Sequence, residues 1–167
     1  GVFRRQRQMC IRDRNGSIAI CDFGFAKKLS GGERAFTICG TPDYLSPEVL
    51  LHQGGSYASD IWAFGVLLFE MLAGYPPFRE DSREKMYDLI VNANFDAVAK
   101  PANFDAKTEM LLREIFVRDE DERLGGTDIG EIMEHPWFDN LDWDAVLNGT
   151  LRPVSYTHLR AHETHEH

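Results

Sequence analysis

The residues best suited to chemistry lie between Asp22 and Glu48. Asp22-Phe23-Gly24 starts this stretch, Ser46-Pro47-Glu48 ends it, and Thr37-Ile38-Cys39-Gly40-Thr41-Pro42 lies between them. Asp22 follows Ser17–Cys21, whose alternating apolar side chains predict a short strand. A carboxylate at the end of a strand is a possible metal ligand on a rigid support. Asp22-Phe23-Gly24 alone equally fits a turn after a strand, whereas the ordered series of motifs is specific.

The elements around this stretch are predicted to be mainly helical. Phe25 to Ala35 is a loop by composition, and Pro47-Glu48 begins a short helix. A longer helix is predicted over 58–73, where nearly every side chain is apolar and Gly74 follows. A helix that is apolar on nearly all sides belongs at the centre of a domain.

Three further helices are predicted over 82–91, 106–116 and 128–134, the last one capped by Asp128. The turn signal Asn15-Gly16 places a hairpin before Asp22. The chain is therefore predicted to be mainly α, with a short β-hairpin at its N-terminal end.

Composition limits the classes of partner. The 167 residues suit one domain and carry a net charge of -9, which repels nucleic acid and anionic lipid but would also serve solubility alone. The three cysteines have unrelated spacings, which indicates a reducing compartment. The longest apolar run, Ile61–Phe69, is too short to cross a bilayer. We expect a cytoplasmic protein with no nucleic-acid partner and no membrane segment.

The two ends differ in character from the rest. Residues 1–14 and 152–167 have no periodicity, and both resemble translated sequencing-adapter sequence, so we expect them to be disordered and not to belong to the gene. The C-terminal end is rich in histidine, but His162-Glu163-Thr164-His165 lacks the spacing of a metalloprotease helix. The predicted domain is 15–151.

Over 15–151 the chain resembles the C-terminal lobe of eukaryotic Ser/Thr protein kinases of the AGC group, and most closely the cyclic-nucleotide-dependent kinases. The motifs that carry the resemblance are the three quoted above together with Asp60-Ile61-Trp62-Ala63-Phe64-Gly65, Gly74-Tyr75-Pro76-Pro77-Phe78, Arg123-Leu124-Gly125 and His135-Pro136-Trp137-Phe138. The resemblance implies part of a kinase-like α+β fold, and a parent enzyme that transfers the ATP γ-phosphate to Ser or Thr of basic-motif proteins.

The resemblance also implies roles for single residues. Asp22 corresponds to a catalytic ligand for Mg²⁺ and MgATP, because a hard dication needs carboxylate oxygen. Thr37 corresponds to the phosphosite that an activating kinase modifies. Thr41 corresponds to a catalytic residue on the ledge that receives the substrate, and it points to Ser/Thr acceptors.

Substrate recognition and anchoring involve further positions in the resemblance. In the resemblance, Ile38, Pro42 and Leu45 would form an apolar pocket for the substrate residue after the acceptor. The carboxylates that bind a substrate arginine would be those of Glu70, Asp43 and Asp81. Ordinary solvated charge is an equal alternative for Asp43 and Asp81. Glu48 and Arg123 would form a buried pair that anchors the segment to the lobe. Asp60 has lost its family partner and could still cap its helix.

Some motifs of the family are absent from this sequence. We find no Gly-rich nucleotide loop, no ATP-binding lysine with its glutamate partner, and no His-Arg-Asp loop with its metal-binding Asn. Ile11-Arg12-Asp13 is an accidental likeness, since position 18 is Ile instead of the required Asn. The sequence predicts an inactive fragment of an active kinase, and the alternative is a non-catalytic, kinase-like binding module (a pseudokinase).

Overall fold

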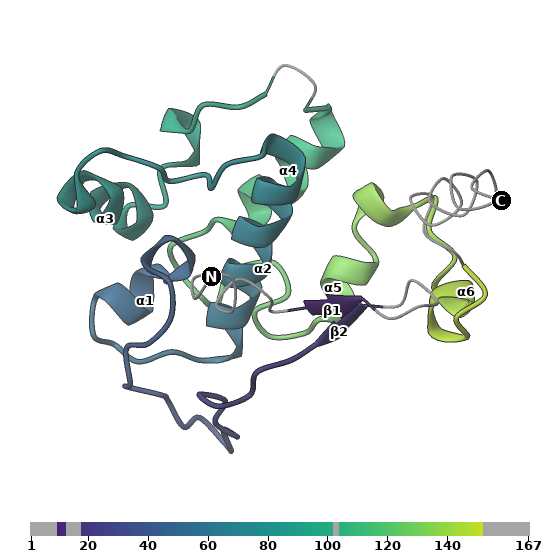
Figure 1. Ribbon diagram of the computed structural model, residues 1–167, viewed down its shortest axis with the longest axis horizontal. Helices are drawn as coiled ribbons and strands as arrows, with labels where there is room; N and C mark the ends of the chain where they lie inside the picture. Colours follow the sequence, from purple (N-terminus) through teal and green to yellow (C-terminus); the bar gives the residue numbers. More distant parts are fainter. Residues whose placement is uncertain (1–9, 13–17, 102–103, 152–167) are drawn as a thin grey trace, which may run out of the picture. The chain divides into compact units, whose positions relative to one another are not determined.

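The computed structural model describes residues 10–12, 18–101 and 104–151. Within these ranges the chain is mainly helical, as predicted, and its residues fall into two compact units (Figure 1). The first comprises residues 1–26 and 140–167, and the second comprises residues 27–139. Among the described residues, no helix is both long and apolar enough to cross a membrane.

Among its described residues, the first unit holds two short strands and one helix. Strand β1 (Cys10–Arg12) pairs antiparallel with β2 (Ile18–Ile20), so that Cys10 lies opposite Ile20. We expected residues 1–14 to be disordered, but β1 lies among them, because backbone pairing does not need the side-chain alternation that identifies a strand in a sequence. The predicted turn at Asn15-Gly16 lies outside the described residues. Helix α6 (Trp143–Leu147) is capped by Asp142.

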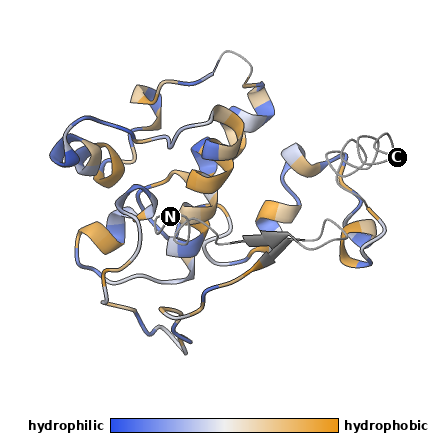
Figure 2. Cartoon of the chain, viewed as in Figure 1, coloured by the Kyte–Doolittle hydropathy of each residue, from blue (hydrophilic) through white to orange (hydrophobic). Residues whose placement is uncertain are grey.

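Helix α2 (Tyr57–Ala73) is the central element of the second unit and begins one residue before the predicted start. Ser56 caps it through a reciprocal pair with Ser59, in which the hydroxyl of each serine accepts a hydrogen bond from the backbone N–H of the other. Gly74 ends the helix with a φ of 81°, a conformation that favours glycine. Hydrophobic residues gather along α2, as Figure 2 shows.

Shorter elements pack around α2. They are η1 (Pro42–Tyr44), α1 (Pro47–Leu50), α3 (Arg83–Val91), η2 (Phe95–Ala97), α4 (Ala106–Ile115), α5 (Gly130–Met133) and η3 (Pro136–Phe138). Helix α2 contacts α4 and η1, α1 contacts α3, and η3 contacts α4. The bounds of α3 and α4 lie within one residue of the predicted helices, because caps and apolar periodicity mark both.

Aromatic rings form the centre of this core. The ring of Trp62, which is fully buried, stacks on Phe78 with centroids 5.4 Å apart and meets Phe116 edge-on at 5.0 Å. Phe69, about two turns further along α2, makes edge contacts with Phe95 and Phe104. These contacts confirm that α2 lies at the centre of the domain, although Met71 near its end is 65% exposed.

Gly65 allows α2 and α4 to approach closely. A Cβ added there would lie 2.5 Å from Cγ2 of Ile115 and 3.1 Å from a ring carbon of Phe116. Both neighbours are buried and have little room to move. The glycine is therefore required by packing, and not by its backbone angles.

We predict that Gly65→Ala lowers the free energy of unfolding by about 1–3 kcal/mol, although alanine is the better helix former. The measurement is urea unfolding followed by circular dichroism. Met71→Ala, on an exposed position of the same helix, is the matched control and should change stability by less than about 1 kcal/mol. A Gly65→Ala variant as stable as the parent would contradict the close approach.

Candidate functional site

Asp22 lies in the first unit, directly before a turn over residues 23–26. Asp22 follows the end of β2 by two residues, and its backbone adopts a φ of 68°. The amide of Ala26 donates to the carbonyl of Phe23 at 3.0 Å and closes the turn. A left-handed conformation outside glycine is strained, and such residues gather at functional sites, although aspartate tolerates it better than most. Asp22 is exposed, and its predicted role as a metal ligand stays a prediction.

The donor type at Asp22 fits Mg²⁺, which binds through one or two carboxylates together with substrate phosphates. Among the residues that the structure describes, no group of three or more His, Cys, Asp or Glu side chains could hold a metal ion.

The predicted substrate-facing residues lie in the second unit, on an extended segment followed by η1. Thr37 and Thr41 are exposed, and Ile38 is 47% exposed. Pro42, Asp43 and Leu45 are half-buried, and Pro42 occupies the first position of η1, where its missing N–H is no loss. The structure places these residues in sequence on one segment, and their roles stay predictions.

Glu70 lies on α2 and accepts a hydrogen bond from the hydroxyl of Tyr44 in η1. Sequence reasoning identified Glu70 but missed Tyr44, because 26 residues separate the pair and no local pattern relates them. The bond fixes the Glu70 carboxylate beside η1. Asp81 is exposed in the loop before α3 and stays a prediction.

Glu48 and Arg123 form the pair that the sequence predicted. Their side chains are 4% and 0% exposed, and two parallel hydrogen bonds of 3.0 and 2.9 Å join the guanidinium to the carboxylate. This two-point geometry is the strongest form of the interaction. The pair connects the first turn of α1 to the loop after α4.

Every remaining donor of Arg123 also has a partner. The guanidinium donates to the carbonyl of Ala58 at 2.7 Å and to the carbonyl of Val117 at 3.1 and 3.2 Å. Its central carbon lies 5.1 Å from the centroid of the Trp62 ring, within range of a cation–π contact. Ser59 donates to Glu48 at 2.6 Å. A buried ion pair needs such satisfaction, because desolvation of both charges is costly.

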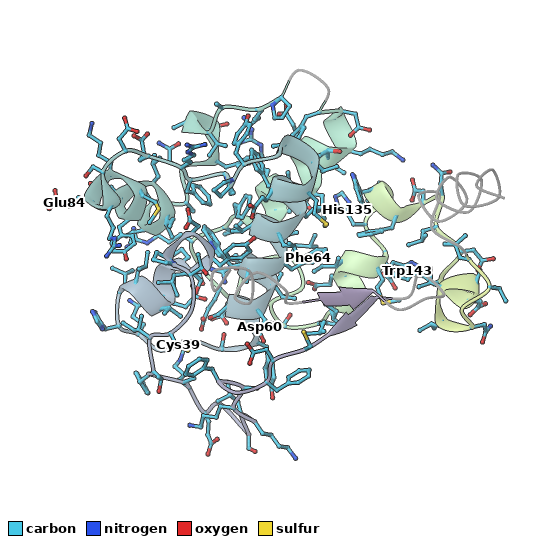
Figure 3. All side chains as sticks on the ribbon, in the orientation of Figure 1. Cys39, Asp60, Phe64, Glu84, His135 and Trp143 are labelled. Atoms are coloured by element: carbon cyan, nitrogen blue, oxygen red, sulfur yellow. The ribbon has the colours of Figure 1, made fainter. Side chains whose placement is uncertain are left out.

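Asp60 lies in the first turn of α2, with Phe64 one turn further on, as Figure 3 shows. We expected Asp60 to cap this helix, but Ser56 and Ser59 do so, because the helix starts at Tyr57 and places Asp60 too far along it. Partial withdrawal of solvent raises the pKa of Asp60. Its carboxylate still complements the positive end of the helix dipole.

Burial alone would raise the pKa of Glu48, but the hydrogen bonds from Arg123 and Ser59 and the positive charge of Arg123 outweigh it, so the pKa lies below the ordinary value of 4.5. A depressed pKa in the folded state stabilises the fold fully above the unfolded value, and this contribution is lost as the pH falls through the folded value. The affected window therefore lies below about pH 4.5.

We predict that Glu48→Gln lowers the free energy of unfolding at pH 7 by about 3–5 kcal/mol, because it leaves the Arg123 charge buried without a counter-ion. The difference between parent and variant should shrink as the pH falls below about 4.5. The measurement is urea unfolding from pH 7 to pH 3.5. Asp96→Asn, which removes the exposed partner of Arg113, is the control and should have little effect at pH 7. A constant parent–variant difference across this range would contradict the assignment.

Comparison with known proteins places this geometry in a family. The family model "Protein kinase domain" matches residues 9–138. The cAMP-dependent protein kinase catalytic subunit PRKX of Homo sapiens is 42% identical over 145 residues, which are 86% of this chain and 39% of that protein. The cAMP-dependent protein kinase catalytic subunit of Dictyostelium discoideum is 40% identical over 147 residues, covering 84% of this chain and 22% of its own length.

A third relative has the same character. The cGMP-dependent protein kinase, isozyme 2 forms cD5/T2, of Drosophila melanogaster is 39% identical over 145 residues, covering 86% of this chain and 15% of its own length. The chain thus spans well under half the length of each of these relatives. The matched region contains the whole segment from Asp22 to Glu48 and the Arg123 that anchors it. The chain belongs to the protein kinase family and is of the AGC type of serine/threonine kinases.

Proposed function

We propose that the chain is part of an enzyme that transfers the γ-phosphoryl group of ATP to Ser or Thr side chains of proteins with an arginine ahead of the acceptor. The observation that carries the proposal is the buried Glu48–Arg123 pair, which fixes the end of the segment on which all but two of the predicted substrate-facing residues lie. Those two, Glu70 and Asp81, follow on α2 and in the loop before α3.

The nucleotide side of the reaction involves Asp22. MgATP, when bound, supplies the phosphoryl group and the cation that neutralises its developing charge. Asp22 would hold that cation through one carboxylate oxygen, directly before the turn that the Ala26–Phe23 hydrogen bond closes. The catalytic base and the nucleotide lysine would come from the rest of the parent enzyme, so we propose that the 167 residues alone do not catalyse transfer.

The substrate side involves the segment before Glu48. Thr41, exposed just before η1, would face the acceptor hydroxyl, and Ile38, Pro42 and Leu45 would contact the following apolar side chain. Glu70, held beside η1 by Tyr44, would pair with the substrate arginine. Phosphorylation of the exposed Thr37 by an activating kinase would add a charge of about -1.5 to -2 that an arginine could bind.

We predict that Glu70→Gln weakens binding of an arginine-containing Ser peptide to the chain by at least about tenfold, through loss of a charge-assisted pair. The measurement is fluorescence anisotropy with a labelled peptide, repeated with its arginine replaced by citrulline. Asp96→Asn, which removes an exposed carboxylate that is not among the proposed substrate-facing residues, is the matched control and should bind within a few-fold of the parent. Equal binding by the Glu70→Gln variant would remove Glu70 from the site.

We predict that an independent transcript, sequenced across position 15, replaces residues 1–14 by a frame containing His-Arg-Asp followed, after four residues, by Asn. That loop would supply the base and the second metal ligand. Recovery of residues 1–14 unchanged would exclude the proposed active parent. Peptide binding without phosphotransfer by the complete protein would then support the non-catalytic binding module.

A further inference from the structure

Arg34 occupies a well-defined site outside the residues discussed so far. Its guanidinium contacts both carboxylate oxygens of Glu120, one of them at 3.3 Å, and it also donates to the carbonyl of Gly54 at 2.9 Å. The two side chains are 35% and 15% exposed, so the pair is partly withdrawn from water. Two-point contact with a carboxylate is the interaction that arginine forms and lysine cannot match.

Glu120 has a second partner that ties the pair to the central helix. The hydroxyl of Ser56, the cap residue of α2, donates to Glu120 at 3.1 Å. Glu120 lies three positions before Arg123 in the same loop. The loop after α4 therefore makes two ion pairs. Its Arg123 binds Glu48, and its Glu120 binds Arg34.

The backbone beside Arg34 is joined to the same place. Ala35 and Gly55 exchange two reciprocal hydrogen bonds of 2.9 and 2.8 Å, and the hydroxyl of Tyr57 donates to the carbonyl of Leu29 at 2.7 Å. Gly54 allows the approach, because a Cβ there would lie 2.9 Å from Cβ of Arg34 and its φ is 86°. These contacts join residues that are 20 to 28 positions apart in the chain.

The consequence concerns residues 36–47, which include Thr37, Thr41 and Leu45. This segment is tethered at both ends, at Arg34 and Ala35 on one side and at Glu48 on the other. A segment fixed at both ends samples far fewer conformations than one fixed at a single end. Without the Arg34 side chain, the backbone bonds between Ala35 and Gly55 and the bond from Tyr57 to Leu29 would be left to hold this end of the segment.

We propose that Arg34 is a positioning residue that clamps the N-terminal end of the substrate-facing segment through Glu120, as Arg123 clamps its C-terminal end through Glu48. The role of the clamped segment in substrate binding rests on the proposed function. The clamp itself is a property of the fold and can be tested without any measurement of phosphotransfer.

The test is amide hydrogen exchange, by NMR, of the full 167-residue chain and its variants. The reporters are the amides of Ala35 and Gly55, whose hydrogen bonds lie beside the clamp. Arg34→Ala and Glu120→Ala should each raise the exchange rate at both reporters by about tenfold, and the double variant should add nothing further. The swap Arg34→Glu with Glu120→Arg should restore most of the protection, which a purely steric role would not.

The amides of α2 serve as the internal reference, since they report global opening. Arg113→Ala, which breaks an exposed ion pair with Asp96, is the matched control and should leave both reporters unchanged. The proposal is overturned if Arg34→Ala leaves the reporters protected, if it raises exchange equally throughout α2, or if the swap restores nothing. Failure of the peptide-binding or transcript prediction with these results intact would remove the proposed function and leave the clamp.

Discussion

The buried ion pair of Glu48 and Arg123 is the constraint on which the second unit depends. Two opposite charges without water are tolerated only when their own donors and acceptors find partners. The carbonyls of Ala58 and Val117 and the hydroxyl of Ser59 meet that requirement. The start of α2 and the loop after α4 therefore have to be where they are for the pair to exist at all.

The apolar core supports the pair from the other side. Trp62 contacts the Arg123 guanidinium with its ring and stacks on Phe78, so one residue connects the charged anchor to the aromatic cluster. The close approach of α2 and α4 at Gly65 brings Phe116 into the same cluster and fixes the loop that follows it. Packing, electrostatics and the position of the segment before Glu48 are in this way parts of one arrangement.

The helices could be predicted from the sequence because their signals are local: a nearly continuous apolar run for α2, apolar periodicity for α3 and α4, and cap residues at Ser82 and Gly74. The Glu48–Arg123 pair was predicted only through the family resemblance. The partners Tyr44 for Glu70 and Glu120 for Arg34 were missed, since 26 and 86 residues separate them and only the folded chain brings them together. Asp60 was misassigned as a cap because the helix starts at Tyr57, which places Asp60 inside its first turn, beyond the cap position.

The separation of 75 residues between Glu48 and Arg123 has a consequence during protein synthesis. A ribosome releases Glu48 long before Arg123, and until then the carboxylate has no counter-ion and cannot be buried without cost. The closure of so long a loop also slows folding. We therefore expect the segment before Glu48 to lack this anchor on the nascent chain until the loop after α4 emerges.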